Sequence, residues 1–464
     1  MAAFDVEQCQ QQGISEECST DCSSNLDQGC QDKSSHSSLD SPQKPKGGIF
    51  RSGGTAPTAV CLSKAAIGAG VLSMSAHAAE VGLVFQLLGL LVGAALTLVS
   101  IQMIARASVE TQRWSYEDIG EELFHPAMSM LTGFMNVCNC LGSAAGYLII
   151  CGQVFQVVSG ASSSMRQLFV VLVGVLICGP LALARHVSFM RHLAAWSVLF
   201  LMLLVVVVVI FLAENGPDES LADISKFWFG SGAVSIFAYM NSANNIVFAY
   251  NNQFNVPQLT GELTPEPTVK RMSMVGIITV ILCFLLFASV SIFGVLAFGV
   301  GENQLNSLVL DLRPMGRNPL VLLSLLGVML SVLTCFQFHV YPIRQFCGFA
   351  ERKLRGRAVE EADVEWKGRT VSRWIDMAVS LTSVAIVIVI AVVVTSLKTI
   401  LDFIGAFASA WISFVVPALW QLQLLRRRED FSWVHYKTLG CLALLGLGLF
   451  FFVFGTYSAI IAAE

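Results

Sequence analysis

The residues that could do chemistry in this chain are polar ones set inside long apolar segments. The first group lies in TAPTAVCLSKAAIGAGVLSMSAHAAEVGL, residues 55–83, where Lys64 precedes Gly68-Ala69-Gly70 by one turn. An ammonium inside a bilayer is costly, and glycine readily leaves helical geometry. The pattern favours a broken membrane helix whose free N–H and C=O groups hold a small ligand. A close helix contact through the glycines is the alternative.

The second group is a cluster of asparagines in SIFAYMNSANNIVFAYNNQFNVPQLTGEL, residues 235–263. Asparagine forms helices poorly and is expensive to bury in lipid without partners. The cluster therefore predicts water, a cavity or backbone that needs partners, and Pro257 restricts the chain beyond it. Hydrogen bonds to neighbouring helices are expected to account for some of the five. They are Asn241, Asn244, Asn245, Asn251 and Asn252.

Two further sets of polar residues lie within apolar runs. Asn136, Asn139 and Ser143 are three to four residues apart, so they share one helix face. Such a face can bind a ligand, but close helix packing is the alternative for these small polar side chains. The second set is Thr334, Gln337 and His339, which precede Tyr341-Pro342-Ile343-Arg344.

Four titratable residues lie near the ends of apolar segments. His77 and Glu80 fall in the outer half of the first segment, where a lone histidine is more often a hydrogen-bonded packing residue than a proton relay. Asp402 lies four residues after Lys398. This spacing predicts an ion pair at the membrane interface.

The elements that must position these residues are membrane helices. The chain has 464 residues, of which 55% are hydrophobic and 13% charged, and this composition is typical of a polytopic membrane protein. About 20 apolar residues cross a bilayer, and eleven segments qualify. The third, sixth and eighth are long enough to be tilted, broken or extended beyond the bilayer. The segments are 55–80, 83–106, 126–158, 167–184, 192–213, 231–261, 271–299, 318–345, 373–396, 399–424 and 436–461.

Charge sets the predicted orientation. With the N-terminus in the cytosol, the inner segments hold 22 of the Lys and Arg residues and the outer loops hold 5, which agrees with the positive-inside rule. Residues 1–46 are rich in Ser, Gln, Asp and Cys and poor in aromatic residues, so they are predicted to be a disordered cytosolic tail. The remaining residues, 47–464, form one transmembrane domain.

The motifs exclude the common enzyme classes. The sequence has no GxSxG, no HExxH, no phosphate-binding GK[ST] and no paired carboxylates inside a span, so we expect no enzyme, no cofactor and no metal site. The two anomalous segments are five spans apart. This spacing is what an inverted five-plus-five repeat requires, with broken helices in corresponding positions and a site at the midplane.

Three motifs in order carry a family resemblance. IGAGVLSMSAHAAEVGL resembles the G-[AS]-G-[IV]-L motif of the amino acid/auxin permease family, in the amino acid–polyamine–organocation superfamily. FAYNNQFNVPQLTGEL is similar to its F-[AS]-[FY]…P…EL motif, and YPIR to its [FY]-P-[ILV]-R. The resemblance covers roughly residues 50–461. Many members have proline at the position of Ser75. Serine at this position resembles the sodium-coupled neutral amino acid branch, and vacuolar amino acid transporters are another similar branch.

The resemblance implies an all-α fold like that of the bacterial leucine transporter. Its two inverted repeats would be residues 55–213 and 231–424, and 436–461 would be an extra helix. Gly68, Ala69 and Gly70 would hold the α-carboxylate of an amino acid. Carbonyls at the second break would hold its α-amino group. The second break comprises Phe248, Ala249, Tyr250 and Asn251, and Asn139, Ser143 and Thr334 are further candidates for substrate binding.

The resemblance also bears on ion coupling. In the sodium-coupled branch an asparagine that helps to coordinate sodium stands four residues before the first motif glycine, and here that position is Lys64. Its ammonium would repel sodium and bond the same oxygens, joining the first and eighth spans with Thr334 as the nearest hydroxyl. We therefore predict sodium-independent transport, either proton-coupled or facilitative. The alternative is that Lys64 extends to the inner interface.

The favoured function is a secondary transporter of neutral or polar amino acids. The alternatives are a cationic amino acid transporter, an amino acid sensor or receptor on the same fold, and a channel. The expected partners are an amino acid, protons as the candidate coupling ion and the lipid bilayer, with no nucleic acid. The membrane is the plasma membrane or a vacuolar or lysosome-like membrane.

Overall fold

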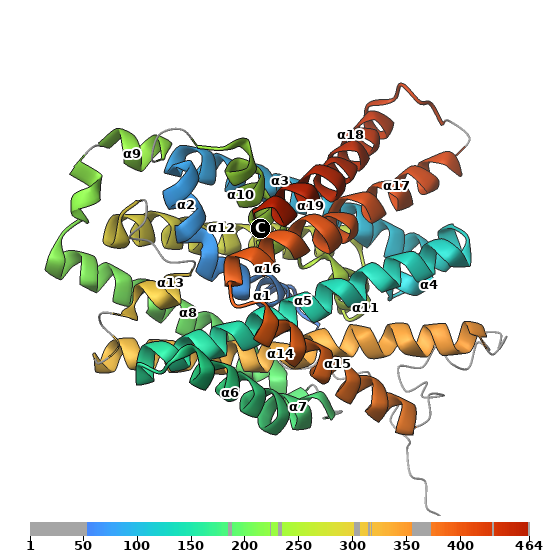
Figure 1. The fold of residues 1–464 in the computed structure, drawn as a ribbon. Coiled ribbons are helices and arrows are strands. Elements are labelled where there is room, and N and C mark those ends of the chain that lie inside the picture. The colour runs from blue at the N-terminus through green and yellow to red at the C-terminus, as the bar shows by residue number, and fades with distance from the viewer. Residues whose placement is uncertain are drawn as a thin grey trace, which may run out of the picture. The chain divides into compact units, whose positions relative to one another are not determined.

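The protein is described by a computed structural model that is helical throughout its described residues (Figure 1). It describes residues 53–462 except 184–187, 223, 231–233, 301–306, 314–315, 317, 355–372 and 429–430. The predicted tail, residues 1–46, lies outside this range. We call the side of the bilayer on which α1 begins the inner side, and the side on which α2 ends the outer side.

Most of the predicted spans are continuous helices. In the described part of the chain, nine helices are long and apolar enough to cross a membrane, and a bent pair raises the number to ten. The predicted span 231–261 is instead divided between two short helices, so the count of eleven stays a prediction. The long helices are α3 (Leu83–Thr111), α5 (Pro126–Ser159), α8 (Ser188–Asn215), α12 (Val269–Phe298), α14 (Pro319–Leu354) and α15 (Arg373–Val393). Three spans contain π-helical turns: α6 to α7 (Ser163–Val173, Gly179–Leu183), α16 to α17 (Leu397–Ile404, Val416–Arg426) and α18 to α19 (Tyr436–Phe450, Thr456–Ile461).

The first span is broken, as its glycines predict. Helix α1 (Thr55–Ala66) ends before Gly68, and the chain resumes as the 3₁₀ turn η1 (Ala69–Ser73) and helix α2 (Met74–Val81). The direction changes by 51° at the break. A Cβ on Gly70 would lie 3.0 Å from both Cα and Cβ of Ala249, so glycine allows the close approach of the two broken segments there.

The sixth predicted span is broken as well. Helix α10 (Ile236–Ala249) ends at Tyr250, and a short 3₁₀ turn, η4 (Gln253–Asn255), leads into helix α11 (Val256–Gly261). Pro257 stands in the first turn of α11, where its missing N–H costs nothing because that donor has no helical acceptor. The two broken segments therefore occur where glycine, asparagine and proline indicated them.

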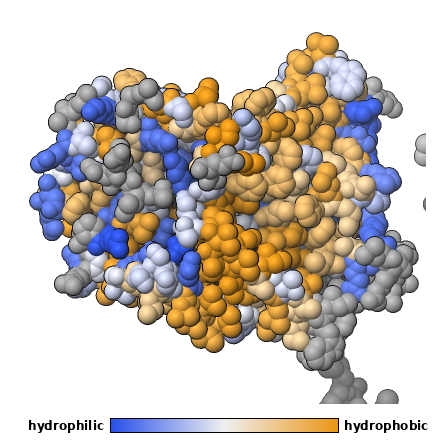
Figure 2. Space-filling model, in the orientation of Figure 1, coloured by the Kyte–Doolittle hydropathy of each residue, from blue (hydrophilic) through white to orange (hydrophobic). Residues whose placement is uncertain are grey.

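Long unbroken helices hold the two breaks in place. Helix α5 packs along α14, and α3 packs along α12 and also contacts α10 (Figure 1). Polar side chains such as Gln86, Asn139 and Asn245 are fully buried, whereas large apolar ones such as Leu88, Leu176 and Leu285 are exposed. Figure 2 shows a broad hydrophobic surface between more hydrophilic ends. This inverted distribution is expected when lipid covers the middle of the molecule.

Candidate functional site

The two broken segments meet at a small cavity. Its walls come from α1, η1, α5, α14 and the end of α10, and the space between them is about 230 Å³ when the open solvent at its mouth is included. Helix termini leave N–H groups without partners at one end and C=O groups at the other. The C-terminal ends of α1 and α10 therefore present carbonyl groups, and the N-terminal end of η1 presents N–H groups. The lining residues are Ala65, Ala66, Gly68, Ala69, Ser143, Tyr147, Phe248, Asn251 and His339.

Half of the ten predicted binding residues lie at this cavity. Gly68, Ala69, Ser143, Phe248 and Asn251 line it directly. The others are placed as follows: Gly70 contacts Ala249 behind the wall, Asn139 bonds to Asn251, Tyr250 packs against Phe287, and Thr334 bonds to the carbonyl of Ser331. Tyr250 and Thr334 are not among the residues that line the cavity, and the binding roles of all ten residues stay predictions.

A triad of buried amide and hydroxyl groups lies beside the cavity. Asn251 Nδ2 donates to Asn139 Oδ1 at 2.6 Å and to Ser409 Oγ at 2.9 Å, and Ser409 Oγ lies 2.9 Å from Asn139 Oδ1. The triad joins α5, the break after α10 and the π-helical turn η7 (Gly405–Ser409). Asn251 Oδ1 and Asn139 Nδ2 have no hydrogen-bond partner among the described residues. One free acceptor and one free donor are therefore held next to the cavity.

Two aromatic side chains on the cavity were not predicted as binding residues. Tyr147 and His339 meet edge to face with ring centroids 5.2 Å apart. His339 Nδ1 lies 3.1 Å from the carbonyl of Cys335, which fixes the ring orientation. The rings narrow the cavity on the α5 and α14 side. A tyrosine among the small residues of LGSAAGYLII was the available sequence signal for Tyr147.

Lys64 is buried close to the cavity. Only 3% of the residue is exposed, and its Nζ donates to Ser331 Oγ at 2.7 Å. The predicted bond between the first and eighth spans therefore exists, but its hydroxyl is Ser331 and not Thr334, because Ser331 is the residue of α14 that faces α1. Among the described residues no carboxylate pairs with this ammonium. The burial contradicts the alternative that Lys64 extends to the interface.

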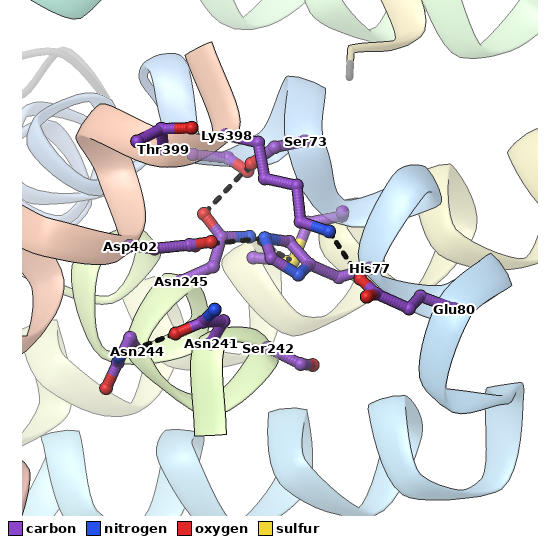
Figure 3. A network of polar contacts seen from close by, with 12 residues as sticks. Ser73, His77, Glu80, Asn241, Ser242, Asn244, Asn245, Lys398, Thr399 and Asp402 are labelled. Carbon is purple, nitrogen blue, oxygen red and sulfur yellow. Dashed lines mark hydrogen bonds and ion pairs between the residues drawn. The ribbon is translucent and has the colours of Figure 1, made fainter. Parts of the chain in front are cut away.

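Three of the five clustered asparagines, Asn241, Asn244 and Asn245, lie on α10 and bond to neighbouring segments (Figure 3). Asn245 Oδ1 accepts a 2.9 Å hydrogen bond from Ser73 at the end of η1. Asn244 donates to the carbonyl of Gly455, and Ser458 donates to Asn241. These bonds to neighbouring helices confirm the structural alternative for three of the five. Asn251 alone of the five lines the cavity.

The residues at the outer side pair differently from the prediction. His77 Nε2 lies 3.0 Å from Asp402 Oδ1, and Lys398 pairs with Glu80 (Figure 3). The predicted ion pair between Lys398 and Asp402 is therefore wrong. Helices α2 and α16 pack against each other, so the titratable side chains of one helix find their partners on the other. Sequence spacing within one helix could not reveal these partners.

These features define a class of protein: a multi-pass membrane transporter built around discontinuous helices. Two solved structures have a similar fold. The manganese transporter of Eremococcus coleocola, in complex with an aromatic bis-isothiourea compound, aligns with a TM-score of 0.56 and 14% identity, over 88% of this chain and 86% of that one. MhsT in complex with L-phenylalanine aligns with a TM-score of 0.57 and 14% identity, over 87% and 98%.

The chain belongs to the family described as transmembrane amino acid transporter protein, which it matches over residues 51–461. It is similar to the amino acid transporter AVT6E of Arabidopsis thaliana, with 23% identity over 391 residues, 81% of this chain and 77% of that protein. The family resemblance found in the sequence is thereby confirmed, as is the helical fold of the leucine transporter type. A transporter family also agrees with the expectation that the chain is not an enzyme.

The Asn251 amide is expected to contribute to substrate affinity. Replacing Asn251 by Ala removes two buried hydrogen bonds and the free Oδ1 beside the cavity. The lost Oδ1 is the group available to a charged α-amino group, and a hydrogen bond to a charged group contributes about 1.5–3 kcal/mol, so KM should rise by about tenfold or more. Uptake kinetics of Asn251→Ala measure this change. Asn241→Ala is the matched control, because Asn241 lies on α10 before the break and its partner Ser458 lies away from the cavity. An equal rise in KM for both variants would contradict a binding role for Asn251.

Proposed function

We propose that this protein is a secondary transporter that carries amino acids by alternating access, with the substrate bound between the breaks after α1 and α10. The observation that carries the proposal is the cavity at which both breaks meet, lined by Gly68, Ala69, Phe248 and Asn251. A cavity of this kind at paired broken helices is typical of transporters, and neither a channel nor a receptor needs the pair.

The two breaks suit the two charges of an amino acid. N–H groups at the start of η1, from Ala69 onward, favour the α-carboxylate, because helix N-termini carry partial positive charge. Carbonyls near Phe248 at the end of α10 favour the α-amino group. Asn251 Oδ1, which has no partner among the described residues, adds an acceptor. A zwitterion thus finds complementary groups on both sides without a charged side chain.

The cavity supports neutral or polar amino acids as substrates. None of its lining residues is a carboxylate, which a dedicated arginine or lysine carrier would need to balance the substrate charge. Tyr147 and His339 offer polar atoms and ring edges to a small side chain. A cationic substrate remains the second candidate, tested by the competition experiment below.

Transport is tested by counterflow. Proteoliposomes loaded with unlabelled amino acid should accumulate the labelled one transiently, and a panel of the twenty amino acids as competitors should rank neutral and polar ones highest. Strong competition by arginine and lysine alone would select the cationic alternative. Binding of the labelled amino acid without counterflow would select the sensor or receptor.

Sodium independence follows from the position of Lys64. The sequence places this lysine where the sodium-coupled branch has a coordinating asparagine, and its Nζ bonds Ser331 on α14. A fixed positive charge there opposes a bound cation, since like charges repel strongly in a low-dielectric site. Transport is then proton-coupled or facilitative.

The distribution of Lys and Arg supports a cytosolic N-terminus.

A further inference from the structure

Two contacts between ionisable side chains connect α2 and α16 on the outer side of the cavity. His77 pairs with Asp402, and one turn further out Glu80 pairs with Lys398 (Figure 3). The inner pair is buried, with side-chain exposures of 0% and 4%, whereas the Lys398 and Glu80 side chains are 23% and 39% exposed. The two helices are thus joined by a buried contact below a partly hydrated one.

The buried contact is incomplete as a hydrogen bond. His77 Nε2 and Asp402 Oδ1 are 3.0 Å apart, but neither these atoms nor His77 Nδ1 meet the angular requirements of a hydrogen bond with any described residue. Neutral histidine would leave a buried carboxylate beside an uncharged ring, which is costly. An imidazolium would make a neutral ion pair at the same place, and histidine is the side chain that gains its charge between pH 5 and 8.

The helices that pack most closely against α2 and α16 carry no further histidine in the described part of the chain. The charged residues of α3 and α12, which pack against α2, are Arg106, Glu110, Lys270 and Arg271, all in the turns at the inner ends of their helices. Tyrosine and cysteine ordinarily keep their protons at neutral pH, and aspartate ordinarily keeps its negative charge. The other titratable groups on elements packed against α2 or α16 are Cys138, Cys140, Tyr147 and Cys151 on α5, Tyr239 on α10, Cys283 on α12, Asp311 on α13 (Leu308–Asp311) and Tyr457 on α19.

We propose that His77 and Asp402 form a proton-binding site that holds the outer pathway closed. The inference rests on the proposed function, because it assumes that α2 and α16 part to admit substrate. On closure one proton moves from the outer aqueous phase to the imidazole, and the resulting pair carries no net charge. On opening, water reaches both groups and the proton returns to the same phase. No proton crosses the membrane at this site.

The sign of the pH effect follows from this exchange. The closed state holds one proton more than the open state, so a rise in outer pH favours opening. One-proton linkage changes the opening equilibrium by at most about tenfold per pH unit. The partly hydrated pair of Glu80 and Lys398 joins the same two helices without a histidine and serves as the reference contact.

Hydrogen–deuterium exchange tests the proposal on the full chain in lipid nanodiscs. Opening constants for peptides that cover 74–81 and 397–404 are compared at pH 5.5 and 7.5, after correction for the intrinsic exchange rate. We expect the wild-type constants to be at least tenfold larger at pH 7.5. His77→Gln cannot carry charge and should show less than a twofold difference. Glu80→Gln, the control, should keep the wild-type pH response.

The outcomes separate this inference from the proposed function. A flat wild-type profile contradicts the proton site without reference to any variant, as does an unchanged pH response in a folded His77→Gln protein. Asp402→Asn provides a second variant with the same expected flat profile. Counterflow of labelled amino acid on the same preparations tests transport separately. Its absence contradicts the proposed function and leaves the exchange result as it stands.

Discussion

Gly70→Val is expected to reduce amino acid uptake by about tenfold to a hundredfold. A Cβ at Gly70 would lie 3.0 Å from Cα and Cβ of Ala249 and 3.1 Å from the Phe248 ring, so the valine methyl groups force the two breaks apart. Overpacking costs about 1–3 kcal/mol, and 1.4 kcal/mol corresponds to a factor of ten. The displaced groups are those that bind the substrate head, so uptake of labelled amino acid measures the change.

A second glycine provides the matched control for Gly70→Val. Gly440 lies on α18, and a Cβ there would have no neighbour within 4 Å. Gly440→Val therefore adds the same methyl groups to a membrane helix without touching the breaks, and should transport as the wild type does. Surface expression of each variant is measured alongside. Normal uptake by a fully expressed Gly70→Val would exclude the site between the breaks.

The breaks were predictable because their signals are local. Glycine at 68 and 70 removes the penalty for leaving the helix, and Asn251, Asn252 and Pro257 disfavour continuing one. Each signal can be read within a dozen residues. The same locality explains why the third and eighth spans could be recognised as long ones, and they are the helices α5 with 34 residues and α14 (Pro319–Leu354).

The partners of the polar residues were not predictable in the same way. Ser409 meets Asn139 across a separation of 270 residues, and Ser331 meets Lys64 across 267. Which hydroxyl faces a given helix depends on the rotation of both helices about their axes, and a shift of three residues exchanges Thr334 for Ser331. Spacing within one helix suggested Lys398 for Asp402, whereas the packing of α2 supplied His77.

Lys64→Ala is expected to lower amino acid uptake by roughly tenfold to a hundredfold. Uptake by the wild type should be equal in sodium, lithium and choline media. Hydrogen bonds to a charged group contribute about 1.5–3 kcal/mol, and the variant loses the bond from Nζ to Ser331 that joins α1 to α14. It also leaves the Ser331 hydroxyl facing a void. Lys437→Ala is the control, because it removes the same charge from a solvent-exposed position on α18.

The ion dependence of the wild type and of the Lys64→Asn variant tests whether the Lys64 ammonium takes the place of a sodium ion. Uptake by the wild type and by Lys64→Asn is measured in the three media at several pH values. Strict sodium dependence of the wild type would contradict a role for Lys64 in place of the ion, because a fixed ammonium and sodium cannot share one set of oxygens. Normal uptake by Lys64→Ala would show that the contact with Ser331 only packs the helices. A pH gradient, acid outside, that drives accumulation in sodium-free proteoliposomes would select proton coupling over facilitated diffusion.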